Sequence, residues 1–278
     1  MTEFRPSSFP ILPIVIKNLL IINVLFFLAQ NTIAPTVVDF DDLLGLHHLK
    51  SPLFQPWQIV THLFLHAGLG HIVSNMFALW MFGSVLENLW GPKRFLTFYF
   101  LCGIGAGLIQ LAWLWFDYRN LLNDFYLLKM QQSPTQIIQF LQQYGKDFGE
   151  IFYRTGGPDI LNFVKENPSD PVVINKSLEY ITNLTSAKVN SPTIGASGAV
   201  FGILAAFVYL FPNTEIYLYF LFPIKAKWIG LAYFGYEIYS GIVNNTGDNI
   251  AHWAHIGGGL VGFLLVLTWN KRNRQTFY

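Results

Sequence analysis

The chain has 278 residues, of which 53% are hydrophobic and only 12% are charged, and its mean hydropathy is +0.39. Soluble domains carry about 25% charged residues, so this composition indicates a membrane protein. A net charge of +1 excludes a nucleic-acid-binding surface that depends on bulk positive charge. The single cysteine, Cys102, excludes an intrachain disulfide and a cysteine-rich metal site.

Six apolar segments are long enough to cross a membrane, which takes about 20 residues in helical form. In chain order they are residues 11–30, 71–90, 95–116, 194–211, 226–243 and 250–269. The first segment is not followed by a small-residue cleavage site, so we interpret it as a retained helix. The sequence therefore predicts an all-α membrane protein with six transmembrane helices and both termini on one side.

The loops on the side of the termini carry most of the positive charge: Arg5, Lys17, Lys93, Arg94, Lys225, Lys227, Lys271, Arg272 and Arg274. The first loop on the opposite side, residues 32–70, carries Asp39, Asp41 and Asp42 against Lys50. Positively charged loops remain in the cytoplasm. We therefore expect both termini to be cytoplasmic, in an integral protein of a bacterial inner membrane.

A polar segment, residues 117–192, separates the third and fourth expected helices, and its acidic and basic residues nearly balance. Amphipathic stretches at residues 135–144 and 172–184 predict short helices within it. The expected topology places this insertion on the extracytoplasmic side. Its composition fits a folded cap beside the membrane as well as it fits a floppy linker.

Ser197 lies between the small residues Gly195 and Gly198, at the beginning of the fourth apolar segment. A serine needs a neighbouring base before it can act as a nucleophile. His255, in the sixth segment, is a candidate base, because desolvation keeps an imidazole neutral and able to accept a proton. Polar side chains within a membrane are costly, so these two residues indicate hydrolysis inside the bilayer.

Further residues would support this pair. His71 and Asn75 are four residues apart, so on a helix they share one face. Both can donate hydrogen bonds toward one point, as an oxyanion hole requires, and amide groups at the helix start around Ser197 would add donors. Gly258 and Gly262 form a Gly-x-x-x-Gly pair, which permits two helix backbones to approach closely.

In this order and on these segments, the residues resemble the motifs of the rhomboid intramembrane serine proteases. The matching pieces are His66-x4-His71-x3-Asn75, Glu87-x3-Gly91-Pro92-x-Arg94-Phe95, Gly195-Ala196-Ser197-Gly198, and Ala254-His255-x-Gly257-Gly258 with Gly262. A lone Gly-x-Ser-Gly is weak evidence, whereas the ordered set is highly specific. The similarity extends over all six expected helices.

The resemblance implies a rhomboid-like six-helix bundle and an intramembrane serine endopeptidase with a Ser197–His255 dyad and no acidic third member. It implies an oxyanion hole made by the backbone at Ser197 and the side chains of His71 and Asn75, with Phe201 packed on the catalytic imidazole. Substrates would be single-span membrane proteins in the lipid bilayer, cut in or near a helix-destabilised segment. It implies neither a metal nor an organic cofactor, and it leaves the oligomeric state open.

Other features need a separate interpretation. Trp57-Gln58 stands where many family members have Trp-Arg, so the first loop is expected to be anchored differently. We expect Glu87 to brace the cytoplasmic turn and Glu237, within the fifth segment, to be a hydrogen-bonded structural acid. His252 is a weaker candidate base than His255, because it lies at the mouth of the sixth helix.

Four alternatives stay open. A catalytically silent rhomboid-like protein would bind membrane-protein clients for trafficking or quality control. A channel or transporter would use the intramembrane histidines, although the chain has no internal repeat. His62, His66 and His71 have a spacing that suits a metal or haem, although the His-Glu-x-x-His pattern of zinc proteases is absent. Ser197 could also serve helix packing alone.

Overall fold

The computed structural model describes residues 10–33, 38–218, 222–243, 248 and 250–273. The helices of the bundle are α1 (Ile14–Thr32), α4 (Leu69–Ala78), the π-helical η2 (Leu79–Gly83), α5 (Ser84–Trp90), α6 (Pro92–Gln131), α11 (Ser197–Leu210), α12 (Ala226–Val243) and α13 (His252–Asn273). The loop between α1 and α4 contains α2 (Phe40–Leu44), α3 (Gln58–Thr61) and η1 (His62–Phe64). The chain is an all-α membrane protein, as the sequence predicts.

Most of the expected transmembrane segments form helices close to their expected limits, and α12 matches residues 226–243. The expected start of α1 at residue 11 is wrong, because Pro13 precedes its first turn as the N-cap. The third expected segment, residues 95–116, lies within a longer helix. The helix α6 continues to Gln131, so its 40 residues extend roughly 60 Å.

The number of membrane crossings stays a prediction. Four helical stretches of the described chain are long and apolar enough to span a bilayer: Ile14–Thr32, Leu69–Trp90, Pro92–Gln131 and His252–Trp269. The helix α11 is apolar but has only 14 residues. The fifth expected crossing, α12, carries Lys227 and Glu237 among its 18 residues.

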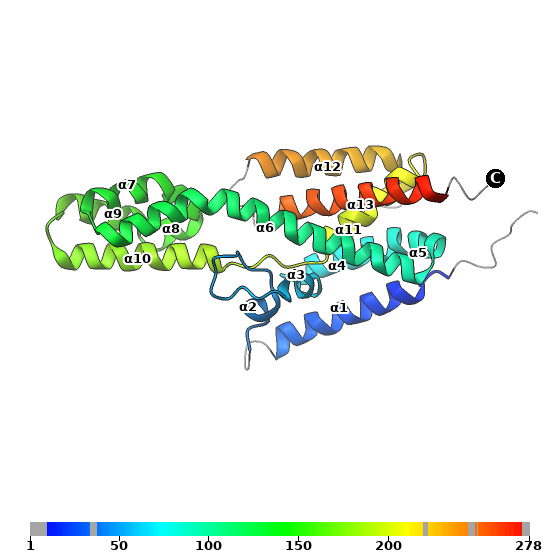
Figure 1. Ribbon diagram of the computed structural model, residues 1–278, viewed down its shortest axis with the longest axis horizontal. Helices are drawn as coiled ribbons and strands as arrows, with labels where there is room; N and C mark the ends of the chain where they lie inside the picture. The colour runs from blue at the N-terminus through cyan, green and yellow to red at the C-terminus, as the bar shows by residue number, and fades with distance from the viewer. Residues whose placement is uncertain (1–9, 34–37, 219–221, 244–247, 249, 274–278) are drawn as a thin grey trace, which may run out of the picture.

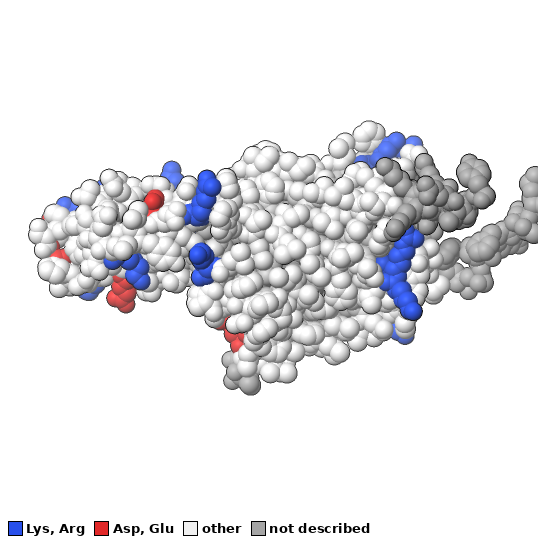
Figure 2. All heavy atoms as spheres, in the orientation of Figure 1, with Lys and Arg blue, Asp and Glu red and all other residues white. Residues whose placement is uncertain are grey.

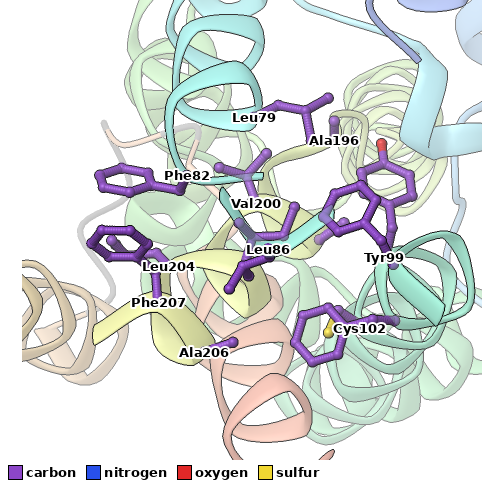
Figure 3. Close-up of a cluster of buried hydrophobic side chains, with 14 of the residues drawn as sticks. Leu79, Phe82, Leu86, Tyr99, Cys102, Ala196, Val200, Leu204, Ala206 and Phe207 are labelled. Atoms are coloured by element: carbon purple, nitrogen blue, oxygen red, sulfur yellow. The ribbon is translucent and has the colours of Figure 1, made fainter. Parts of the chain in front are cut away.

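The bundle is arranged around α11, whose side chains are buried along most of the helix. Figure 3 shows the close packing at its centre, where α11 meets the α4–α5 segment and α6. The labelled side chains are Leu79, Phe82, Leu86, Tyr99, Cys102, Ala196, Val200, Leu204, Ala206 and Phe207. Cys102 is fully buried in this core, so it acts as an apolar packing residue.

One end of the bundle gathers the beginning of α1, the turn between α5 and α6, and the end of α13 (Figure 1). The buried carboxylate of Glu87 links two of these elements, since it accepts hydrogen bonds from the amides of Val15 at 2.9 Å and Ile16 at 2.8 Å. Glu87 therefore satisfies the otherwise free amides at the start of α1. The expected brace is present, but it joins α1 to α5.

Charged side chains avoid the middle of the bundle on the face in Figure 2, where Lys and Arg appear only toward its two ends. An uncharged belt of this kind is what a lipid environment requires of a protein surface. Large apolar side chains are exposed along the bundle helices, among them Leu25, Val73, Leu101, Leu231 and Leu260. This distribution is consistent with a membrane protein.

A small hairpin follows α11, where the sequence predicts only a loop. The strands β1 (Glu215–Leu218) and β2 (Phe222–Lys225) pair in antiparallel register, with Glu215 opposite Lys225. Alternation explains the strand: Ile216 packs against the bundle core, while Glu215 and Tyr217 are exposed. The two-residue period spans too few positions to stand out in the sequence.

The insertion is a packed helical unit, so the floppy-linker alternative is wrong. It contains α7 (Pro134–Tyr144), η3 (Gly145–Phe148), α8 (Glu150–Arg154), α9 (Gly157–Glu166) and α10 (Pro171–Asn190). These helices pack with the far half of α6, which runs out of the bundle as one continuous helix (Figure 1). Their shared core contains Leu121, Phe125, Leu128, Ile137, Phe140, Leu141, Phe152, Val164, Ile181 and Leu184.

Candidate active site

The segment before α11 is held by the first loop through backbone hydrogen bonds. Leu46 and Thr193 exchange two of them, at 2.9 and 2.8 Å, and the amide of Gly195 donates to the carbonyl of His62 at 2.9 Å. Gly195 has a φ of +131°, which favours glycine. This arrangement turns the chain sharply, so that Ser197 begins α11 with a fixed orientation.

The structure brings Ser197 and His255 together, although they lie 58 residues apart in the chain. Nε2 of His255 lies 2.7 Å from Oγ of Ser197, within hydrogen-bonding distance. His255 is only 9% exposed. Because Nε2 is available as an acceptor, this geometry allows the imidazole to take the hydroxyl proton.

The contact depends on the close approach of α11 and α13. A Cβ atom added to Gly258 would overlap the carbonyl oxygen of Gly198, and one added to Gly262 would lie 2.5 Å from the carbonyl oxygen of Gly202. The backbones of α11 and α13 are therefore in contact at Gly198–Gly258 and at Gly202–Gly262, where a larger residue would not fit. Gly258 follows His255 by one helical turn, so this contact sets the distance between imidazole and serine.

Phe201 packs on the imidazole of His255. The two ring centroids are 4.3 Å apart and the planes make an angle of 11°, which is a stacked arrangement. Phe201 also contacts Phe234 of α12, with centroids 5.7 Å apart. The stacking restricts rotation of the imidazole, so it helps to keep Nε2 directed at Ser197.

His71 lies beside the turn that precedes Ser197. A Cβ atom on Gly195 would be 2.9 Å from Nε2 of His71 and 3.5 Å from Oγ of Ser197, so the imidazole and the hydroxyl flank the same glycine. Nδ1 of His71 accepts from the amide of Ala67 at 3.3 Å. In the neutral ring the proton is therefore on Nε2, which makes this nitrogen a donor.

Asn75 presents an unused donor on the same helix face. It is 6% exposed, and its Nδ2 atom has no hydrogen-bond partner among the described residues. Buried amides are nearly always hydrogen-bonded, so an exception needs an explanation. A free donor on the helix face that also carries His71 is suited to a negative charge that exists only during a reaction.

A carboxylate also lies beside His255, which the resemblance did not imply. Oε2 of Glu237, on α12, lies 3.0 Å from Nδ1 of His255 and 2.6 Å from Nδ1 of His252. Oδ2 of Asp248 lies 3.0 Å from Nε2 of His252. The sequence offered one signal for this, since a lone carboxylate within an apolar helix is rarely without a role.

Among the described residues, one group has donor atoms placed for a metal ion: Glu237, His252 and His255, whose ligand atoms lie within 4.8 Å of one another. Two of the separations, 2.6 and 3.0 Å, are typical of hydrogen-bonded partners. Tetrahedral zinc would hold its nitrogen and oxygen ligands about 3.3 Å apart. This cluster therefore fits shared protons better than a metal.

The histidines of the first loop form no such group. Nδ1 of His62 lies 2.7 Å from the carbonyl oxygen of Gln58, and burial lowers the pKa of His62 to about 4, so its ring is neutral. Burial and the neighbouring His71 lower the pKa of His66 to about 4 as well. The ring of His66 packs edge-on against His71, with centroids 5.0 Å apart. The structure gives the metal or haem interpretation no support here.

Gln58 organises the first loop, at the position where the sequence departs from the family pattern. It is fully buried, and its Oε1 accepts from the amides of Gln55 at 3.1 Å and His47 at 3.3 Å. Its Nε2 donates to the carbonyl of Leu53 at 2.9 Å and reaches those of Asp42 and Leu43. The neutral side chain of Gln58 therefore connects three parts of the loop by hydrogen bonds: residues 42–43, residue 47 and residues 53–55.

Replacing Gln58 with alanine is expected to destabilise the protein by about 2 kcal/mol or more, because buried backbone groups lose their partners. Thermal unfolding in detergent micelles measures this loss. Gln55→Ala is the matched control, since the Gln55 side chain makes no hydrogen bond among the described residues. Equal melting temperatures for the two variants would contradict this role of Gln58.

A family model of the rhomboid domain matches residues 53–118 and 172–272. The chain belongs to the rhomboid family. The matched parts contain the Ser197–His255 pair, His71 and Asn75. The unmatched residues between the two parts, 119–171, make up most of the insertion. The insertion is thus an addition to the rhomboid domain of this protein.

The relatives are distant. An uncharacterized mitochondrial rhomboid protein of Schizosaccharomyces pombe is 25% identical over 78% of this chain and 52% of its own length. Mitochondrial RHOMBOID-like protein 12 of Arabidopsis thaliana is 22% identical over 95% of this chain and 60% of its own length. Rhomboid protease GluP of Bacillus subtilis is 40% identical over 48 residues, which are 17% of this chain and 10% of its own length.

The chain spans between half and two thirds of the length of the first two of these relatives. The rhomboid family includes proteins named as proteases, which supports a peptidase at the level of the family. Relatives named as mitochondrial weigh against the bacterial inner membrane that the sequence predicted. That the protein is integral to a membrane is supported by its family and by its apolar helices.

Proposed function

We propose that this protein is an intramembrane serine endopeptidase in which Ser197 is the nucleophile and His255 the general base. The observation that carries the proposal is the 2.7 Å contact between Oγ of Ser197 and Nε2 of His255. A nucleophile within hydrogen-bonding distance of an oriented base is the signature of covalent catalysis. Membership of the rhomboid family, which includes named proteases, adds support.

In the proposed reaction, Oγ of Ser197 attacks the carbonyl carbon of a substrate peptide bond while Nε2 of His255 takes the hydroxyl proton. The tetrahedral intermediate collapses as the C–N bond breaks, and the imidazolium returns that proton to the leaving amine. A water molecule, activated by the same nitrogen, then hydrolyses the acyl-enzyme. The chain needs no cofactor for these steps.

The developing oxyanion would be stabilised by His71 and Asn75. Nε2–H of His71 and Nδ2–H of Asn75 are the donors, and the amide of Ser197 at the start of α11 adds a third. Donors that are already oriented cost no reorganisation when the charge appears. The unsatisfied amide of Asn75 supports this role, because none of the described residues accepts a hydrogen bond from it.

We propose single-span membrane proteins as substrates, entering from the lipid bilayer. The helix α13 begins toward the end of the bundle that carries the insertion and runs to the opposite end, where α1 begins (Figure 1). His255 lies in the first turn of α13, and Nε2 of His255 is 2.7 Å from Oγ of Ser197. The excess of basic residues at the end where α1 begins favours its cytoplasmic location. We propose accordingly that the site opens on the extracytoplasmic side, beside the insertion.

The test is cleavage of a fluorescent single-span substrate by the protein reconstituted in proteoliposomes. We expect fragments cut in or near the transmembrane segment, and none from the Ser197→Ala variant. Several unrelated single-span substrates are tested, because a single substrate could lack a sequence that the protein cleaves. Binding of these proteins without any cleavage would favour the catalytically silent alternative and contradict the proposal.

Replacing Asn75 with alanine should lower kcat about 10²- to 10³-fold, equivalent to about 3 to 4 kcal/mol of transition-state stabilisation. The melting temperature should hardly change, because the Nδ2 atom has no partner to lose in the described structure. Asn162→Ala, at an exposed position in the insertion, is the matched control. A fall in stability without a fall in kcat would show that Asn75 serves packing alone.

A further inference from the structure

Glu237 completes a line of polar atoms that begins at Ser197. Oγ of Ser197 lies 2.7 Å from Nε2 of His255, and the other ring nitrogen, Nδ1, lies 3.0 Å from Oε2 of Glu237. Nucleophile, imidazole and carboxylate therefore follow one another in the order of a Ser–His–acid triad. The three residues come from three different helices, α11, α13 and α12.

The tautomer of His255 requires an acceptor at Nδ1. When Nε2 accepts the proton of Ser197, the neutral ring carries its own proton on Nδ1. Nδ1 is buried and has no well-aligned hydrogen bond among the described residues, and Oε2 of Glu237 is a carboxylate oxygen within reach of it. Such catalytic contacts are often poorly aligned before substrate binds.

The carboxylate is itself held in place. His252 lies 2.6 Å from the same Oε2 through Nδ1 and 3.0 Å from Oδ2 of Asp248 through Nε2. A carboxylate oxygen accepts, so both nitrogens of His252 donate, which makes His252 a cation. Glu237 is 4% exposed, and this cation compensates the charge that burial would otherwise penalise.

The charges of the whole array balance during the proposed reaction. Glu237 and Asp248 contribute two negative charges and His252 one positive charge. When His255 takes the proton of Ser197, it adds a second positive charge. The side chains of Glu237, Asp248, His252 and His255 then have a net charge of zero. The environment therefore favours the imidazolium that the proposed mechanism forms in its transition state.

We infer that Glu237 is a positioning residue of the proposed protease: its carboxylate accepts the Nδ1 proton of His255, fixes the reactive tautomer and stabilises the imidazolium. The inference rests on the proposed function. It changes the implied Ser–His dyad into a triad whose acid is supplied by α12. His252 and Asp248 orient this acid and have no contact with the serine in this role.

The test compares kcat and KM of Glu237→Gln with the wild type, using the single-span substrate in proteoliposomes. Glutamine keeps the size of the side chain but removes the charge. We expect kcat to fall about 10²- to 10⁴-fold with KM changed less than threefold, as when the acid of a triad becomes an amide. Glu215→Gln, on the exposed face of β1, is the matched control and should behave as wild type.

Glu237→Asp provides a second variant if Glu237→Gln does not fold. It keeps the charge but shortens its reach, so kcat should lie between those of the wild type and Glu237→Gln. A kcat for Glu237→Gln within threefold of wild type, in a protein that Ser197→Ala inactivates, would overturn the inference and leave the proposed function intact. Failure of the wild type itself to cleave would count against the proposed function.

Discussion

Replacing Ser197 or His255 with alanine should lower the rate of substrate cleavage about 10⁴-fold or more. The nucleophile and its base act as one unit, so the double variant should be no slower than either single variant. What remains in each case is the contribution of the oxyanion donors and of substrate binding. The measurement is single-turnover cleavage in proteoliposomes, with melting temperatures recorded in parallel.

Ser186→Ala is the matched control for the serine, because it lies exposed on α10 in the insertion and should leave the rate unchanged. Additive losses in the double variant would mean that Ser197 and His255 act independently. Cleavage that survives in Ser197→Ala would mean that another residue is the nucleophile. Either result contradicts the mechanism built on the 2.7 Å contact.

Gly258→Ala is expected to remove most activity without touching a polar side chain. The new Cβ would overlap the carbonyl oxygen of Gly198, so α11 and α13 must separate. Overpacking of this kind costs about 1 to 3 kcal/mol of stability. A displacement of about 1 Å between reacting groups lowers a rate about 10²-fold, so cleavage should fall by at least that factor.

The control for this variant is Gly235→Ala on α12, where an added Cβ meets no atom within 4 Å. It should cleave substrate at the wild-type rate with an equal or higher melting temperature. Cleavage rates and melting temperatures of both variants in the same lipid test the comparison. Wild-type activity of Gly258→Ala would show that the approach of α11 and α13 does not set the site geometry.

Hydropathy predicted much of the bundle, because a membrane-crossing helix needs a continuous apolar run that is visible in the sequence. The limits of α12 agree with the predicted residues 226–243. The far end of α6 was not predicted, since residues 117–131 are amphipathic and lack a continuous apolar run. Their apolar side chains pack against the insertion. Tertiary contacts also distinguish a packed cap from a linker, which composition alone left open.

Only part of the candidate site was predicted, because a sequence shows local motifs but not contacts between distant helices. Ser197, His255, His71 and Asn75 are marked by local motifs, and the structure brings the first three together at the start of α11. Asn75 lies one turn beyond His71 on α4. Glu237 has no motif, because its partners His252 and His255 lie on another helix beyond a loop. The alignment of α12 with α13 that creates this contact is a property of packing and leaves no spacing signal.

The insertion is connected to the site through the first loop. Oγ of Ser51 donates to Oδ1 of Asn190 at the end of α10, at 2.7 Å, and the ring of His48 contacts that of Tyr118, with centroids 5.4 Å apart. Three residues after Asn190, Thr193 forms the backbone bridge with Leu46 of the first loop. The insertion therefore ends against the first loop, whose backbone hydrogen bonds hold the segment that precedes Ser197.

The most direct test of the account is to find where a mechanism-based serine-hydrolase probe binds covalently. The folded protein is treated with a fluorophosphonate, digested and sequenced by mass spectrometry. The account predicts an adduct on Ser197 in the wild type and a rate of labelling reduced about 10³-fold or more in His255→Ala. An adduct on a different residue, or equally fast labelling without His255, would contradict it.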